Sequence, residues 1–230
     1  MTKEVPLLYD KQLSCHICDH NFTSKKLRSR YIRVKQVNND FSKEYKDASR
    51  NPLLYEVYVC PECGYAFNDQ FQETFHQAQR EQFINKISSK WRKQDFSGER
   101  SHEEAVRVFK LAVVAGEQTM QPDIILAGIC MKLSWLLREL NEEDEATRFV
   151  NFSIQKFEKA FSYGNYESMS ELKVIYILGE LHRLLNRNGE AIKYFSKVIQ
   201  HKHRHMEPQI VEMARDQWYK AREKNKAVNR

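Results

Sequence analysis

Two pairs of cysteines, each in the spacing Cys-x-x-Cys, constrain this chain more than any other feature. Cys15 and Cys18 lie in CHIC, and Cys60 and Cys63 lie in CPECG. A turn of this spacing directs both sulfurs at one centre, and the glycine that follows the second pair suits the bend of such a knuckle. Two knuckles supply four thiolates, a closed tetrahedral ligand set for a structural Zn²⁺ ion. We therefore predict a metal site at these four cysteines.

The segment between the two pairs, residues 19–59, is long for a four-cysteine zinc site, so it must fold back on itself. Two stretches alternate apolar and polar residues as half-buried strands do: RYIRVKQV at 30–37 and LLYEVYV at 53–59. We expect these two strands to form the hairpin that brings the second cysteine pair to the metal. A redox-active dithiol is the main alternative, although no βαβ pattern surrounds either pair.

The chain has 230 residues, of which 41% are hydrophobic, so it can bury a sizeable core. No apolar run approaches the ~20 residues of a membrane span, and the N-terminus lacks the pattern of a secretory signal. We expect a cytoplasmic protein, because reduced cysteine pairs in that compartment bind metals rather than form disulfides. A change in periodicity predicts two domains, a zinc-ribbon-like domain over 1–67 and a helical domain over 68–230.

From about residue 68, apolar residues recur with the 3.6-residue period of amphipathic helices. Ser101 and Glu104 form a capping box at one helix start, and Pro122 opens another helix. Three helices share an alanine followed four positions later by a larger apolar residue: Ala105, Ala146 and Ala191. Small residues at fixed positions let paired helices pack closely. We predict a mostly α chain, in which a small β zinc ribbon precedes an antiparallel array of tetratricopeptide-like repeats; an ordinary helical bundle is the alternative.

The stretches CHICDHNFTSKKLRSRYIRVK and NPLLYEVYVCPECGYAF, followed by Phe71 and the helical remainder, resemble a bacterial family called domain of unknown function (DUF) 2225. The resemblance extends over essentially the full length. It implies a metal-binding N-terminus with the four paired cysteines as ligands and a helical-repeat C-terminus, mainly in Gram-positive bacteria, and it implies no particular activity. The chain departs from the family pattern at His16 and Asp19, where members often have proline and glycine, and at Ser42, where some carry another cysteine.

Residues 25–35 are strongly basic and contain no acid, whereas the whole chain has a formal net charge of +6. The basic residues are Lys25, Lys26, Arg28, Arg30, Arg33 and Lys35. Such a stripe can attract phosphate, so one hypothesis is nucleic-acid binding through a basic strand. The alternative is a solvated strand face, because surface charge of this kind is common.

The main hypothesis is a non-enzymatic adaptor, since we find no phosphate loop, no Gly-x-Ser-x-Gly elbow and no His-Glu-x-x-His motif. A helical repeat array presents a groove to a protein partner, and its expected lining is Met131, Trp135, Arg138, Lys173, Tyr176, Glu180 and Arg183. The basic residues in this set suit an acidic or carboxylate-ended peptide. A third hypothesis is a thiol-based redox or metal sensor, in which oxidised thiolates lose zinc and release a bound partner.

Overall fold

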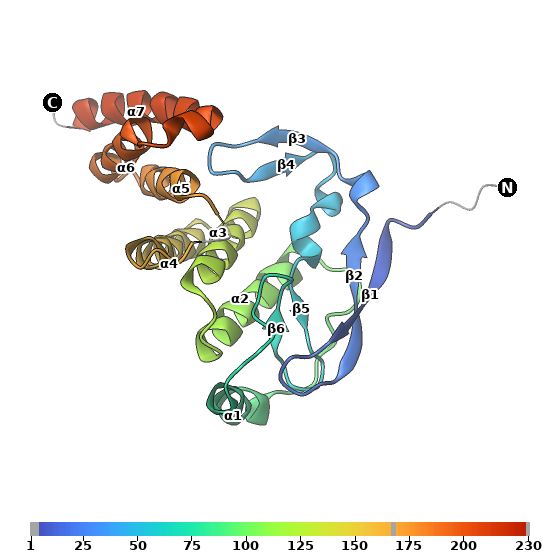
Figure 1. Cartoon of the computed structure of the whole chain (residues 1–230). Helices are drawn as coiled ribbons and strands as arrows, with labels where there is room; N and C mark the ends of the chain where they lie inside the picture. The colour runs from blue at the N-terminus through green and yellow to red at the C-terminus, as the bar shows by residue number, and fades with distance from the viewer. Residues whose placement is uncertain (1–4, 167–168, 229–230) are drawn as a thin grey trace.

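The structure, a computed structural model that describes residues 5–166 and 169–228, has β-hairpins in its N-terminal third and helices in the remainder (Figure 1). Three separate antiparallel sheets of two strands each pair β1 with β2, β3 with β4 and β5 with β6. The strands are β1 Leu8–Ser14, β2 Asn21–Leu27, β3 Val34–Val37, β4 Lys43–Tyr45, β5 Tyr58–Val59 and β6 Ala66–Phe67. The helices are α1 Gln77–Lys86, α2 His102–Gln118, α3 Asp123–Glu139, α4 Glu143–Ser162, α5 Glu171–Leu184, α6 Asn188–Gln200 and α7 Pro208–Val228. The prediction of a mostly helical chain with small antiparallel sheets is confirmed.

The expected hairpin between residues 30–37 and 53–59 is wrong. Residues 29–31 form a 3₁₀ turn, and β3 pairs with β4 instead. Residues 52–55 form another 3₁₀ turn, because Pro52 fixes its own φ and the Asn51 side chain accepts a hydrogen bond from the Leu53 N–H. Strand β5 is only two residues long and pairs with β6. The basic segment 25–35 is therefore the end of β2, a turn and the start of β3, and not one strand.

The hydrophobic core joins the β-hairpins to the first helices. Val57, Tyr65 and Phe67 belong to the same buried cluster as Phe109 on α2 and Leu133 on α3. Each of these five side chains is at most 3% exposed. The division at residue 67 stays a prediction, and the core is continuous across it.

A buried arginine connects three parts of this region, and no acid among the described residues forms an ion pair with it. Arg100, which is 6% exposed, precedes α2. Its guanidinium donates to the carbonyl oxygens of Phe96 and Val57, both at 2.6 Å, and to the Ser24 hydroxyl at 3.1 Å. Burial lowers the pKa of Arg100 to about 10. These hydrogen bonds hold β2 and the segment before β5 against the start of α2.

The helices that follow pack as consecutive neighbours. Helix α3 packs on α4, and α5 and α6 pack on each other and on α7. Short loops join α3 to α4 and α5 to α6, so each of these pairs lies antiparallel. The three alanines that recur in the sequence are buried in this array: Ala105, Ala146 and Ala191. None of the helices within the described ranges combines the length and the apolarity that a membrane crossing needs.

The closest approach between α5 and α6 gives the first prediction. A Cβ atom built at Gly179 on α5 lies 2.7 Å from the ring of Phe195 on α6, which is fully buried. We expect Gly179→Ala to destabilise the protein by about 1–3 kcal/mol, because the ring has no room to move. Gly189→Ala is the matched control, since nothing lies within 4 Å of its Cβ. Thermal unfolding followed by circular dichroism measures both, and equal melting temperatures contradict the prediction.

Candidate metal centre

Each cysteine pair lies in the loop of a β-hairpin. The first pair follows β1, and the second follows β5. The two loops repeat one hydrogen-bond pattern: the Cys15 N–H donates to the His20 carbonyl, and the Cys60 N–H donates to the Tyr65 carbonyl, both at 2.9 Å. In the first loop the Ile17 N–H also donates to the Cys15 sulfur, at 3.4 Å. The sequence therefore folds twice into the same knuckle, which points its sulfurs at the other hairpin.

The residue after each pair has a left-handed backbone, with φ of 59° at Asp19 and 74° at Gly64. This conformation favours glycine, and aspartate tolerates it better than most residues do. At Gly64 the space is closed as well, because an added Cβ lies 2.5 Å from the Trp91 ring. The bend that we predicted at Gly64 is thus present, and Asp19 adopts the same backbone conformation in the first knuckle.

The four sulfurs meet at one point. The Cys15 and Cys63 sulfurs lie 3.4 Å apart, and the Cys18 and Cys60 sulfurs lie 3.6 Å apart. All four lie within 4.8 Å of one another. Four sulfurs at ~2.3 Å from a tetrahedral zinc ion stand about 3.8 Å apart, so the cluster fits this ion closely. The prediction that these four cysteines can hold a metal is confirmed in its geometry.

The electrostatics of the cluster favour a cation. Hydrogen bonds from Cys15 and Cys63 lower the pKa of Cys60 to about 2. The hydrogen bond to Cys60 raises the pKa of Cys15 to about 12, and contacts with both sulfurs raise the pKa of Cys63. The contacts among these sulfurs therefore stabilise the thiolate of Cys60 and disfavour the thiolates of Cys15 and Cys63 as long as no cation is bound. Zn²⁺ supplies that charge when bound, and four thiolates leave it no open position for a substrate.

Helix α1 and the turn after it hold both knuckles from outside. The Arg80 guanidinium forms an ion pair with Asp19 of the first knuckle, at 2.6 Å. The Ser88 hydroxyl and the Trp91 indole N–H donate to backbone carbonyls of the second knuckle, each at 2.9 Å. Sequence reasoning missed these supports. The only signal was a tryptophan in a polar stretch just past the end of the helix.

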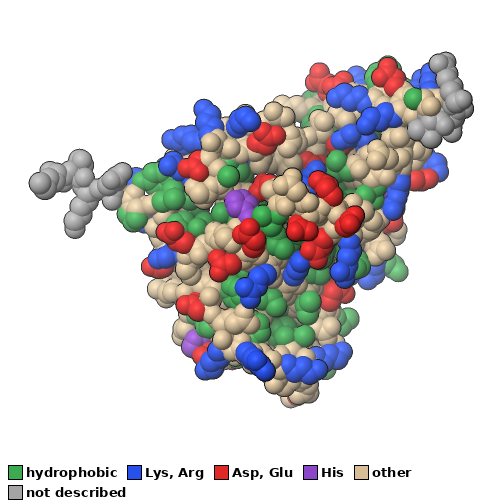
Figure 2. Space-filling model, turned by 180° about the vertical axis from the view of Figure 1, so that it is seen from behind, with side chains coloured by type: hydrophobic (Ala, Val, Ile, Leu, Met, Phe, Trp, Pro, Cys, Tyr) green, Lys and Arg blue, Asp and Glu red, His purple; other side chains and the backbone are tan. Residues whose placement is uncertain are grey.

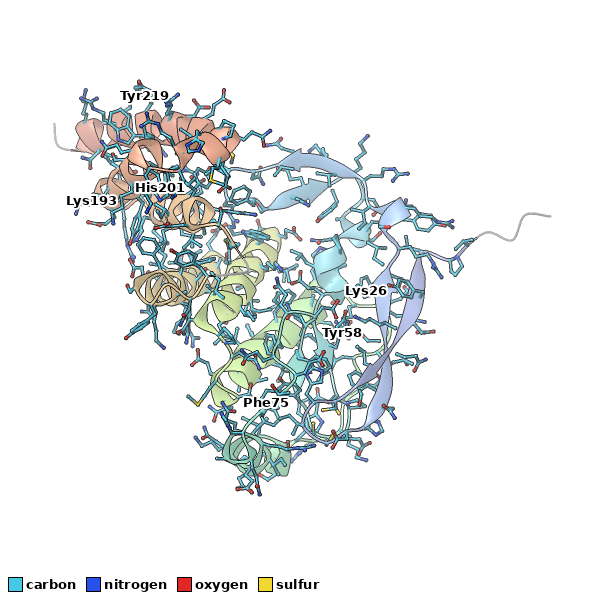
Figure 3. All side chains as sticks on the ribbon, in the orientation of Figure 1. Lys26, Tyr58, Phe75, Lys193, His201 and Tyr219 are labelled. Atoms are coloured by element: carbon cyan, nitrogen blue, oxygen red, sulfur yellow. The ribbon has the colours of Figure 1, made fainter. Side chains whose placement is uncertain are left out.

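The basic residues of 25–35 do not form one surface stripe. Half of them are paired with acids of this chain: Lys25 with Asp10, Lys26 with Asp69, and Lys35 with Glu44. The others stack on tyrosines or donate to a carbonyl: Arg28 on Tyr9, Arg30 on Tyr31, and Arg33 to the Arg30 oxygen. Figure 3 shows Lys26 beside Tyr58, whose hydroxyl lies 3.0 Å from the ammonium. On the face in Figure 2, basic and acidic side chains are interspersed. Nucleic-acid binding stays a hypothesis. The acids that pair with these lysines weaken the positive electrostatic potential that nucleic-acid binding requires.

The seven residues predicted to line a groove lie on α3 and α5. They differ in exposure. Met131, Tyr176 and Glu180 are buried, with at most 5% of each residue exposed. They therefore belong to the floor of the predicted groove or to the helix core beneath that floor. Arg183 is bound to Glu180 by two hydrogen bonds, of 2.8 and 2.6 Å. Trp135 packs against the buried cluster between these helices.

Sequence reasoning missed the segment that covers these residues of α3 and α5. The hairpin tip, residues 38–42 between β3 and β4, reaches α3 and α5 (Figure 1). Arg138 forms an ion pair with Asp40 of the tip, and the Tyr176 hydroxyl donates to the Asn39 carbonyl at 2.9 Å. Beside these contacts a cavity of about 300 Å³ lies between the hairpin and the helices. Its charged lining residues are Asp40, Arg138, Glu180 and Arg183.

The metal centre gives the second prediction. We expect the purified protein to contain one zinc ion per chain, and Cys60→Ser to lose it. Removing one ligand leaves the other thiols close together without a cation. We therefore expect the free energy of unfolding to fall by about 3 kcal/mol or more and Tm to fall by roughly 6–12 °C. Cys130→Ala is the control, because Cys130 is buried in α3 outside the cluster. Elemental analysis and thermal unfolding test this, and a Cys60→Ser protein that retains its zinc contradicts the site.

Comparison with known proteins agrees with the resemblance seen in the sequence. Residues 8–221 match the profile of a family described as "Uncharacterized protein conserved in bacteria (DUF2225)". Neither a curated protein nor a solved structure shows significant similarity to the chain. Since the match covers nearly the whole chain, from β1 to the last turns of α7, this protein belongs to the bacterial family DUF2225.

Proposed function

We propose that this protein is a non-enzymatic, cytoplasmic, zinc-binding adaptor that engages a protein partner through the groove between α3 and α5. In this proposal the metal has a structural role, because four thiolates complete its coordination. The paired helices α3 with α4 and α5 with α6 act as two tetratricopeptide-like units. The close contact of Gly179 with Phe195 supports that reading, since small residues at such crossings are typical of these repeats.

The observation that carries the proposal is the segment already bound in the groove. Groove residues from two helices contact residues 38–42 through an ion pair, a hydrogen bond and an aromatic contact. A surface that binds an extended segment of its own chain has the shape and chemistry to bind one from a partner. The basic side chains at the groove, among them Lys173 and Arg138, suit an acidic segment.

The third prediction uses Lys173 to test the groove. We expect Lys173→Glu to reduce recovery of the native partner by about tenfold, because its new charge repels an acidic segment. Lys193→Glu is the control with the same charge change, since Lys193 is exposed on α6 at the far side of the array from the hairpin (Figure 3). Affinity purification from a bacterium that encodes the protein, with quantitative mass spectrometry, measures recovery.

The melting temperatures of both variants must lie within a few degrees of that of the unmodified protein, because among the described residues neither Lys173 nor Lys193 forms a buried ion pair. Equal recovery with Lys173→Glu and with the unmodified protein contradicts partner binding in this groove. Arg183→Glu is a poorer test, since it places a second carboxylate beside Glu180, which is 1% exposed, and destabilises α5.

A further inference from the structure

The hairpin tip contacts the groove through three kinds of chemistry. Its acid, Asp40, is 4% exposed and pairs with Arg138 on α3. Its aromatic ring, Phe41, meets the Tyr176 ring edge to face at a centroid distance of 5.5 Å, with the Lys173 ammonium 5.1 Å from its centre. Its backbone contributes the Asn39 carbonyl, which accepts a hydrogen bond from the Tyr176 hydroxyl. The tip is therefore bound as a peptide ligand is bound, by an ion pair, an aromatic contact and a backbone hydrogen bond.

The tip is shaped for this contact at a conformational cost. Phe41 has φ of 63°, in the left-handed region that disfavours residues with a Cβ atom. Within the tip, the Ser42 N–H and hydroxyl donate to the Asp40 carboxylate at 3.1 and 2.6 Å, which aims the other carboxylate oxygen at Arg138. Phe41 packs against both hydrophobic clusters of the helical array. The strained backbone is thus compensated by contacts that exist only while the tip lies in the groove.

Outside its tip, the hairpin is mostly exposed and has few buried contacts with the helices. All four residues of β3 are exposed, including the apolar Val34 and Val37 at 38% and 55%. On β4, Lys43 and Glu44 are exposed too, whereas Tyr45 is partly buried, and burial together with Glu139 of α3 raises its pKa to about 12. Strands without buried contacts contribute little to holding an element in place, so the tip carries most of the attachment. Release of the tip therefore breaks few other contacts.

We infer that the hairpin tip is an internal ligand of the groove, and that the partner is an extended protein segment in which Asp or Glu is followed by an aromatic residue. This inference rests on the adaptor function proposed above. The partner segment replaces Asp40 on Arg138 and Phe41 on Tyr176 and Lys173. Because Asp40 already neutralises Arg138, and Glu180 neutralises Arg183, the groove offers a carboxylate no free arginine until the tip leaves.

Competition with the tip sets the affinity of the partner. A tethered segment acts at an effective concentration in the millimolar range, so a partner must bind more strongly than the tip does. The strain at Phe41 weakens the tip in this competition. The groove consequently rejects weak acidic peptides and admits a segment that makes all three kinds of contact without the left-handed residue.

The test is binding of a cyclic peptide with the sequence of residues 36–44, QVNNDFSKE, to the full-length zinc-loaded protein. The recipient is the variant Asp40→Ala/Phe41→Gly, which removes the acid and the ring, while glycine keeps the left-handed turn available. We follow the chemical shifts of ¹⁵N-labelled α3 and α5 amides as peptide is added. We expect these shifts to saturate in the variant within ~10 mM peptide, at a peptide concentration at least ~10-fold lower than in the unmodified protein. Adding Arg138→Ala, or changing the peptide residues at the Asp40 and Phe41 positions to Asn and Ala, should abolish the response.

Three outcomes overturn the inference. The first is no saturation in the variant up to ~10 mM, a concentration above that of a tethered segment. The second is equal binding by the variant and by the unmodified protein, since an internal ligand must compete. The third is a dimer of the unmodified protein in light scattering that the variant loses, because the tip then occupies a second copy of this chain. The peptide needs no cellular partner, so its failure is distinct from failure of the Lys173→Glu test.

Discussion

The meeting of four cysteine sulfurs is the contact on which the N-terminal third of this protein depends. The sulfurs come from two separate hairpins, and the second hairpin has strands of only two residues each. Strands this short are not stable alone in water. A cation shared by both knuckles links them as a crosslink does, and its binding free energy becomes folding free energy. We therefore regard metal binding and folding of residues 8–67 as one coupled process.

The same link determines where the β3–β4 hairpin lies. That hairpin leaves β2 and returns to the segment before β5, so both of its ends are fixed by the hairpins that carry the knuckles. Arg100 fixes the same two ends a second time, through Ser24 on β2 and Val57 before β5. With its base held there, the hairpin reaches across to α5 (Figure 1). The metal centre and the groove are thus connected through the backbone, although they share no residue.

Local patterns in the sequence predicted the features that depend on local chemistry. The spacing of the cysteines predicted the metal ligands, because a Cys-x-x-Cys turn brings two sulfurs together without help from the rest of the chain. The Ser101–Glu104 capping box is present at the start of α2 for the same reason. Strand pairing was predicted wrongly, because alternation shows that a segment is extended on one face and does not identify its partner. Asn51 and Pro52 also turned part of an expected strand into a 3₁₀ turn.

What the sequence determined by itself is therefore the set of four cysteines that can hold a metal and the mostly helical character of the chain after the second cysteine pair. Only the tertiary structure decided which segment covers the predicted groove between α3 and α5. Asp40 and Arg138 are 98 positions apart, and Asn39 and Tyr176 are 137 apart, so no periodic pattern relates them. Likewise, Arg100 shows its importance only when the carbonyls of two segments and the Ser24 hydroxyl of a third surround it. Contacts of this kind depend on how the backbone returns through space, which local propensity and spacing do not encode.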